Sequence, residues 1–193
     1  MKMINADKKL GAIVIGTSAG GLTALSILLE KIPPIYPLPL IVVQHRSKDQ
    51  KTLLEEVLQP KCKIQIKQAD EKEKIEKGIV YIAPPDYHLL IEKDLTFSLS
   101  CDELVLYSRP SIDVLFESAA IAYKDGLIGI ILTGANSDGA AGLQTIKKHG
   151  GITIAQSPAE ATFPRMPSSA IDNGGVMYIL TLKEIQEIIL SYR

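Results

Sequence analysis

Three side chains with the chemistry of acyl transfer each follow an apolar run of this sequence. They are Ser18, in the stretch GTSAG at residues 16–20, His45 and Asp138. A serine hydroxyl becomes a useful nucleophile when an imidazole takes its proton, and a carboxylate can orient that imidazole and stabilise its charged form. These residue types therefore predict a Ser-His-Asp site, on condition that the fold brings them together.

The loop around Ser18 matches the G-x-S-x-G pattern of a nucleophile elbow, a sharp turn between a strand and a helix. In such a turn the backbone N–H groups of Ala19 and Gly20 would point at a developing oxyanion. The G-x-G-x-x-G spacing of a dinucleotide loop fails, because Ser18 occupies the second glycine position, and no Walker lysine follows. A tight strand–helix connection without chemistry remains an alternative.

His45 is the best candidate for the general base, because it ends a buried run expected to lie beside the strand that carries Ser18. A hydrogen-bonded surface histidine is the alternative interpretation of His45. His88 either lines the site or begins a strand. His149 is interpreted as structural, because a cationic side chain is favoured at the end of a helix.

Asp138 lies in the glycine-rich stretch TGANSDGAAG, between a predicted strand and a predicted helix. Its carboxylate is the candidate that orients the imidazole, and the alternative is an ordinary helix N-cap. Asp86, Asp113 and Asp172 compete for the same role. The crowding glycines favour Asp138, since they suit a turn that brings a side chain into a site.

The elements that must position these residues alternate between strands and helices. Buried strands are expected at 12–16, 38–44, 126–134 and 152–156, and helices at 21–32, 49–59, 111–125, 138–151 and 181–193. Short strands with tight turns are expected at 63–69, 78–84, 88–93, 96–100 and 103–107, with at least one hairpin among them. The pattern predicts a doubly wound α/β fold, a mostly parallel sheet with helices on both faces and a small antiparallel hairpin. Ligands bind such sheets at the carboxyl ends of the strands, where the three candidate residues lie.

Composition narrows the class of protein further. The 193 residues are 46% apolar and 22% charged with a net charge of −1, which indicates one soluble domain over residues 1–193 and no nucleic-acid partner. Cys62 and Cys101 lack metal-ligand spacing and are interpreted as reduced thiols of a cytoplasmic protein. No signal peptide or bilayer-spanning run is expected, and nothing calls for a metal or another cofactor.

Several linked stretches resemble the catalytic domain of the chemotaxis protein-glutamate methylesterases, known as CheB-type. In family order, from about Ala12 to about Leu182, they are IGTSAGG, VVQHRS, GIVYIAPPDYHLL, RPSIDVLFESAA, GANSDGAAGL and TIAQSPAEATFPRMPSSAI. The resemblance implies that Ser18, His45 and Asp138 form the catalytic triad. It also implies that glutamate methyl esters on cytoplasmic chemoreceptor helices are hydrolysed, with methanol released and no cofactor needed. Many members also deamidate receptor glutamines.

Three departures from the family's usual pattern lie beside the expected site. The family usually has Gly-Met-Gly where this chain has GAN at residues 134–136. Ala19 replaces a frequent threonine after the nucleophile, and Arg46 replaces a frequent methionine after the histidine. The change at 134–136 is expected to reshape the loop beside the catalytic carboxylate.

The resemblance implies a partner, the cytoplasmic domain of methyl-accepting chemotaxis receptors. A monomer is expected, although nothing in the sequence determines the oligomeric state. Arg46 or Arg109 would hold acidic receptor side chains near the target ester. Too little chain precedes Ala12 for the phosphorylatable receiver domain that usually comes first in the family, so activity is expected to be independent of phosphodonors. A catalytically idle binding module and an esterase or amidase with an unrelated substrate remain the alternatives.

Overall fold

The chain folds around one parallel sheet and a separate two-stranded ribbon, in a computed structural model that describes residues 10–45 and 54–192. The main sheet has seven strands in the order β3-β4-β2-β1-β7-β8-β9, all parallel. Its strands are β1 (Ala12–Thr17), β2 (Leu40–Gln44), β3 (Gln65–Gln68), β4 (Ile79–Ile82), β7 (Leu127–Ile131), β8 (Ile152–Gln156) and β9 (Tyr178–Leu180). The ribbon pairs β5 (His88–Ile91) with β6 (Phe97–Ser100) in antiparallel fashion. The predicted fold class, including the small hairpin, is confirmed.

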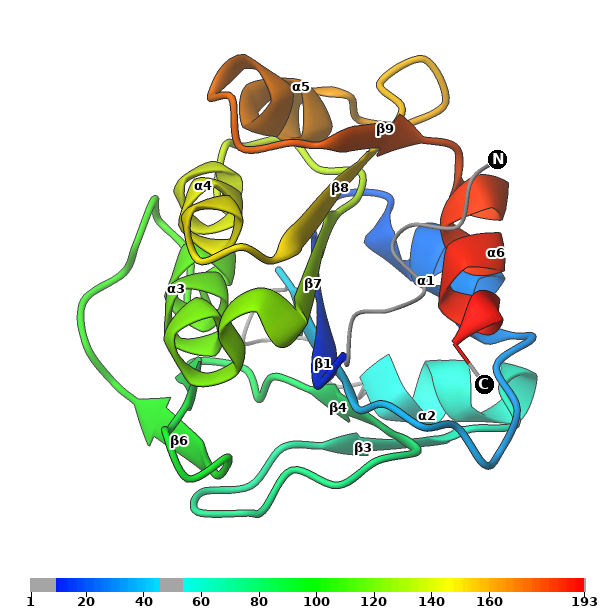
Figure 1. The fold of residues 1–193 in the computed structure, drawn as a ribbon, viewed down its shortest axis with the longest axis vertical. Coiled ribbons are helices and arrows are strands. Elements are labelled where there is room, and N and C mark those ends of the chain that lie inside the picture. Colours follow the sequence, from blue (N-terminus) through cyan, green and yellow to red (C-terminus); the bar gives the residue numbers. More distant parts are fainter. Residues whose placement is uncertain (1–9, 46–53, 193) are drawn as a thin grey trace.

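Helices cover both faces of the sheet. In Figure 1, α1 (Gly21–Leu29) and α6 (Leu182–Ser191) lie on one side of the central strands, and α3 (Ile112–Tyr123) and α4 (Ala140–Lys148) lie on the other. The first side is completed by α2 (Leu54–Leu58), and the second by α5 (Arg165–Asp172). Short 3₁₀ turns follow α2 at Gln59–Lys61 and α3 at Lys124–Gly126.

The continuous apolar runs of the central strands serve two cores at once. Along β1, Ile13 and Ile15 pack into the core beneath α1 and α6, whereas Ala12 and Val14 pack into the core beneath α3 and α4. All four residues are fully buried. Successive strand side chains point to opposite faces, so a strand covered on both sides needs apolar residues at every position.

One expectation about the middle of the chain needs correction. Residues 103–107 were expected to form a strand, but Val105 and Ser108 exchange both backbone hydrogen bonds around a tight turn. Leu106 and Tyr107 have φ values of 47° and 64°, so the backbone reverses where a strand would continue. Tyr107 is 97% exposed, and the apolar pattern here faces solvent instead of a sheet. The expected strands at 63–69 and 78–84 correspond to β3 and β4, which pair in parallel within the main sheet.

The helix expected at 49–59 is described only from Leu54 onward, since residues 49–53 lie outside the described part of the chain. Within the two described stretches, no helix combines the length and the apolar composition needed to cross a bilayer.

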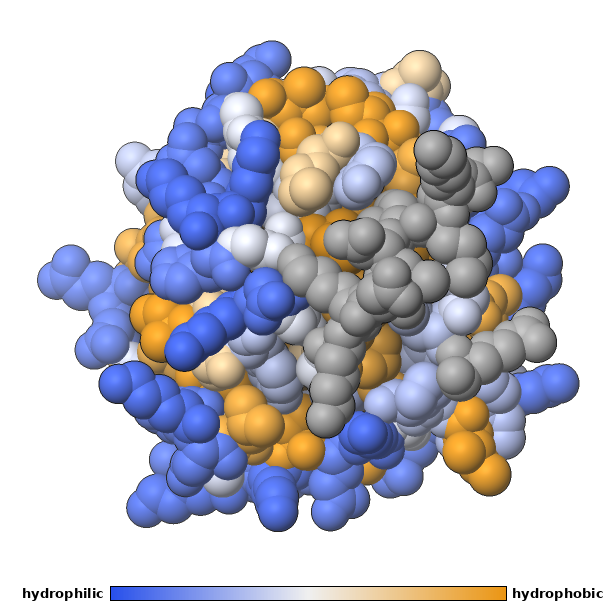
Figure 2. Space-filling model, in the orientation of Figure 1, coloured by the Kyte–Doolittle hydropathy of each residue, from blue (hydrophilic) through white to orange (hydrophobic). Residues whose placement is uncertain are grey.

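The edge strand β9 carries apolar side chains to the surface. Met177 and Ile179 are 47% and 51% exposed at this edge of the sheet. Figure 2 shows apolar surface gathered near α5 and β9, while much of the remaining visible surface is hydrophilic.

Candidate active site

The three candidate residues meet at one edge of the sheet because they follow three adjacent strands. Ser18 follows the central strand β1, His45 follows β2 on one side of it, and Asp138 lies in the loop after β7 on the other side. The strand order reverses direction between β1 and β7, which makes this position a topological switch point. Open parallel sheets bind their ligands at the carboxyl ends of the strands beside such a point.

Backbone hydrogen bonds continue the strand pairing into the loops that carry the candidates. The N–H of Ser18 donates to the Thr133 carbonyl at 3.0 Å, and the N–H of His45 donates to the Thr17 carbonyl at 3.0 Å. The loop with Ser18 is thus held between the two neighbouring loops.

Gln44 ties the nucleophile loop to the histidine, a role that sequence reasoning did not assign. Its Nε2 donates to the carbonyl oxygens of Ser18 and His45, both at 2.8 Å. Gly21 packs so closely against the Gln44 side chain that a Cβ there would overlap it. Gly20 precedes α1 with a φ of 80°, a conformation that glycine adopts without strain. The two glycines after Ser18 therefore have separate tasks, one in the turn and one in the packing.

The Ser18 side chain is half-buried, and its hydroxyl has no hydrogen-bond partner among the described residues. Within the same part of the chain, the N–H groups of Ala19 and Gly20 have no acceptor. A hydroxyl without a partner beside two available backbone donors is the arrangement in which an ester carbonyl could bind. Nucleophile–base hydrogen bonds are often absent or long before a substrate binds.

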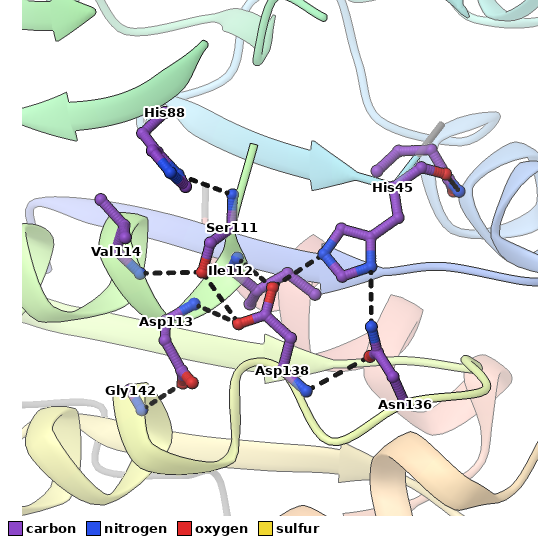
Figure 3. A network of polar contacts seen from close by, with 10 residues as sticks. His45, His88, Ser111, Ile112, Asp113, Val114, Asn136, Asp138 and Gly142 are labelled. Carbon is purple, nitrogen blue, oxygen red and sulfur yellow. Dashed lines mark hydrogen bonds and ion pairs between the residues drawn. The ribbon is translucent and has the colours of Figure 1, made fainter. Parts of the chain in front are cut away.

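His45 and Asp138 are joined by a short hydrogen bond, shown in Figure 3. His45 Nε2 lies 2.8 Å from Asp138 Oδ2, with the histidine side chain 10% exposed and the aspartate fully buried. The other ring nitrogen, Nδ1, faces the side chain of Asn136 at 3.3 Å. The ring nitrogen that can accept a proton from a substrate or a nucleophile is therefore Nδ1.

The carboxylate of Asp138 is held by the N-terminus of α3. The Ser111 hydroxyl and the Asp113 N–H donate to Oδ1 at 2.9 and 3.0 Å, and the Ile112 N–H donates to Oδ2 at 2.7 Å. A helix N-terminus offers unpaired N–H groups and a favourable dipole to an anion. The residue that caps α4 is Gly139, without any side-chain bond, so the Asp138 carboxylate does not cap its own helix.

Burial alone would raise the pKa of Asp138, but the hydrogen bonds from His45, Asp113 and Ile112 outweigh burial and hold the pKa below its ordinary value. Asp138 is therefore ionised at neutral pH. An ionised carboxylate beside Nε2 can orient a neutral imidazole and stabilise the imidazolium that forms when Nδ1 takes a proton.

The three competing aspartates have other surroundings. Asp113 accepts a hydrogen bond from the Gly142 N–H at 2.7 Å, which is a backbone donor in the first turn of α4. Asp86 pairs with Arg109, and Asp172 is exposed at the end of α5. Asp138 is the aspartate whose carboxylate contacts His45.

Of the other candidate residues, His88 and Arg109 do not contact His45 or Asp138 directly in the described part of the chain. His88 is 1% exposed at the start of β5, where its Nδ1 accepts from the Ser111 N–H at 3.1 Å and its Nε2 bonds the Glu103 carbonyl at 3.0 Å. His88 therefore reaches the network only through Ser111. The Arg109 guanidinium donates to Asp86 Oδ1 and to the carbonyl oxygens of residues 101 and 102. Arg46 lies outside the described residues. In the described part of the chain, no cluster of three or more His, Cys, Asp or Glu side chains could hold a metal ion.

Asp113→Asn should stabilise the protein relative to the parent, and this stabilisation should be larger at pH 8 than at pH 5. Burial and the nearby Asp138 charge raise the pKa of Asp113 from 3.8 to about 6. The folded protein then holds this proton more tightly than the unfolded chain, so Asp113 lowers the free energy of unfolding as the pH rises through this range. An asparagine oxygen can still accept from Gly142. The stability difference between variant and parent should grow by about 1 kcal/mol between pH 5 and pH 8.

Urea unfolding at both pH values measures this difference, with Asp102→Asn as the exposed control. A difference that stays constant between pH 5 and pH 8 would show that Asp113 is ionised in the folded protein throughout.

Fold and site together define a doubly wound α/β protein with a serine, a histidine and a buried carboxylate at the switch point of its sheet. The chain belongs to the CheB methylesterase family, whose model matches residues 13–189. A putative protein-glutamate methylesterase/protein-glutamine glutaminase of Leptospira interrogans is 51% identical over 179 residues, which cover 93% of each chain. A protein-glutamate methylesterase/protein-glutamine glutaminase of Archaeoglobus fulgidus is 34% identical, and the match covers 93% of this chain and 52% of that protein. The crystal structure of the Thermotoga maritima CheB methylesterase catalytic domain superposes with a TM-score of 0.90 at 32% identity, covering 94% of this chain and 98% of that one. The resemblance found in the sequence is confirmed.

Proposed function

We propose that this protein hydrolyses methyl esters of glutamate side chains in the cytoplasmic domains of methyl-accepting chemotaxis receptors. The observation that carries the proposal is the 2.8 Å bond between His45 and Asp138 beside Ser18, in a chain of the CheB methylesterase family. The names of the relatives from Leptospira and Archaeoglobus indicate the reaction, and the geometry of the site supports it with a set of groups that can perform it.

In the first half of the reaction, Ser18 Oγ attacks the ester carbonyl carbon while its proton passes to His45 Nδ1. Nε2 is already engaged with Asp138, whose negative charge stabilises the imidazolium. The N–H groups of Ala19 and Gly20 are the proposed donors to the oxyanion, since neither has an acceptor among the described residues. Collapse of the tetrahedral intermediate breaks the bond to the methoxy oxygen, which takes the proton from Nδ1 and leaves as methanol.

In the second half, a water molecule takes the place of methanol. His45 Nδ1 removes one proton from this water as it attacks the glutamyl ester of Ser18, and the same proton then returns to Ser18 Oγ. The products are the free enzyme and a glutamic acid side chain, which releases the second proton of the water to solvent and becomes a carboxylate. No cofactor takes part in the chemistry.

Deamidation of glutamine is a second candidate activity, because the same relatives are named both methylesterases and glutaminases. It uses the same acyl-enzyme, with ammonia leaving in place of methanol. His45 must then give its proton to a poorer leaving group, so deamidation is expected to be the slower of the two reactions.

The proposed substrate lies on acidic receptor helices in the cytoplasm, and an arginine could hold a neighbouring carboxylate. Arg109 offers limited support for that role, because its guanidinium already binds Asp86 Oδ1 at 2.7 Å. Arg46, next to the proposed base, remains the other proposed contact. His88 is proposed to act on the site only by supporting Ser111.

Methanol release from a methylated receptor fragment tests the proposed function. The purified protein should release methanol from the methylated cytoplasmic fragment, and Ser18→Ala should not. A small aryl ester is assayed in parallel. Hydrolysis of the aryl ester alone would indicate an esterase with an unrelated substrate. Binding of the fragment without turnover of either substrate would indicate a binding module.

A further inference from the structure

We propose that Asn136 holds the base nitrogen of His45 in the free protein, and that this contact must break before Ser18 can react. Asn136 is a positioning residue in this proposal, since it acts on His45 and not on the substrate. The breaking of the contact during turnover rests on the proposed function, whereas the contact itself does not.

Asn136 bridges two parts of the site, as Figure 3 shows. Its Oδ1 accepts a hydrogen bond from the Asp138 N–H at 3.2 Å, and its Nδ2 lies 3.3 Å from His45 Nδ1. Its side chain is half-buried, in the loop between β7 and α4.

Hydrogen-bond chemistry fixes the direction of each of these contacts. A backbone N–H only donates, so the Asn136 atom that meets Asp138 is the amide oxygen. The amide nitrogen is left for His45, and it also can only donate. Nδ1 must therefore carry a lone pair, and the proton of the neutral ring sits on Nε2, where the Asp138 carboxylate accepts it. Both neighbours of the ring thus favour the same tautomer.

The consequence is a competition for one lone pair. Nδ1 has a single lone pair in the plane of the ring, and it cannot accept from Asn136 and from Ser18 at the same time. The 3.3 Å separation is at the long end for a hydrogen bond, so this contact is a weak one that a bound substrate could displace. Once Nδ1 is protonated it repels the amide hydrogens. Asn136 cannot offer its oxygen instead without giving up the bond to Asp138.

This contact depends on the side chain of Asn136. The resembled family usually has glycine at this position, and glycine has no side chain to place against an imidazole. Asn136→Gly therefore removes the contact with a residue that the loop of related proteins accepts. Asn136→Asp keeps the shape and the acceptor for Asp138, but turns a second oxygen instead of an amide group toward Nδ1.

Nitrogen-15 spectra of the His45 ring test the contact without any turnover. The chain has three histidines. The signals of His45 are identified as those that disappear from the spectrum of His45→Gln. At pH 8 the parent should show a protonated Nε2 and an unprotonated Nδ1. In Asn136→Gly the Nδ1 signal should move toward the position of a ring nitrogen without a hydrogen bond. In Asn136→Asp both nitrogens should carry protons at a pH where the parent ring is neutral. Ser137→Ala is the control in the same loop and should leave the spectrum unchanged.

The rate at which a sulfonyl fluoride labels Ser18 tests the need to break the contact. Asn136→Gly should be labelled a few-fold faster than the parent, because one weak hydrogen bond no longer competes for Nδ1. Asn136→Asp should be labelled more slowly, and Ser137→Ala at the parent rate. The same order is expected for kcat/KM on the methylated receptor fragment.

The outcomes separate this proposal from the proposed function. An Nδ1 signal that is identical in the parent and in Asn136→Gly would overturn the inference that Asn136 bonds Nδ1. Sulfonyl fluoride labelling of Ser18 that is no faster in Asn136→Gly would overturn the inference that Asn136 competes with Ser18 for Nδ1. If spectra and labelling respond as expected while methanol is not released from the receptor fragment, Asn136 has the inferred role and the proposed substrate is wrong.

Discussion

Ser18→Ala should lower the rate of methyl ester hydrolysis by about 10⁴-fold or more. The alanine removes the atom that forms the acyl-enzyme. The neighbouring Thr17 hydroxyl is not a substitute, because it is fully buried and donates to the Thr133 carbonyl at 2.9 Å. The folded structure should not suffer, because the Ser18 hydroxyl has no partner among the described residues, and the backbone bonds to Thr133 and Gln44 do not involve it. Initial rates of methanol release measure the loss, and urea unfolding checks that stability is unchanged.

Covalent labelling tests independently whether Ser18 is the nucleophile. A sulfonyl fluoride should modify the parent at Ser18 alone and leave Ser18→Ala unmodified. Ser137→Ala, in the facing loop, should retain both activity and labelling. Labelling at another residue, or full activity of Ser18→Ala, would show that Ser18 is not the nucleophile.

The carboxyl edge of the sheet could be predicted from sequence because its signals are local. Continuous apolar runs mark β1, β2, β7 and β8 as strands buried on both faces, and the helical runs between them require parallel crossovers. Once the strands are parallel, the residues that follow them share an edge. Ser18, His45 and Asp138 could therefore be placed together without any knowledge of side-chain contacts.

Elements with weak or misleading local patterns could not be predicted. Helix α5 contains Pro167 and two serines and was not foreseen, although a proline in the first turn of a helix leaves its hydrogen bonds intact. The edge strand β9 is only three residues long. Residues 103–107 have a strand-like pattern but form a turn, because left-handed conformations at Leu106 and Tyr107 reverse the chain.

The partners that tune the site were also beyond the sequence, since they depend on contacts between distant segments. Ser111 caps α3, since its hydroxyl accepts a hydrogen bond from the Val114 N–H. That the same hydroxyl also donates to Asp138 follows only from the packing of α3 against the β7–α4 loop. Gln44 carried no signal except its place between an apolar run and His45. Asn136 was noticeable as a departure from the family pattern, but its contact with Nδ1 was not.

His45→Gln should lower the hydrolysis rate nearly as much as Ser18→Ala. A glutamine amide can still donate to Asp138, so the carboxylate keeps a partner, but it cannot accept the proton of Ser18 at neutral pH. Adding His45→Gln to Ser18→Ala should cost little further, because a nucleophile and its base act as one unit. Rates of methanol release for the two single variants and the double variant measure this. Losses that multiply in the double variant would mean that the two residues act independently.

Asp138→Asn should cost less activity than either variant but still several orders of magnitude. Each oxygen of Asp138 accepts two hydrogen bonds, from His45 Nε2 and the Ile112 N–H on one side and from the Ser111 hydroxyl and the Asp113 N–H on the other. An asparagine NH₂ in either orientation meets a backbone N–H, so stability should fall as well, by about 1–3 kcal/mol. A stability loss alone is therefore not diagnostic of catalysis. The deciding measurement is kcat for folded Asp138→Asn well below its unfolding temperature. Parent-like kcat under those conditions would make Asp138 only an anchor for the N-terminus of α3, and another group would have to orient His45.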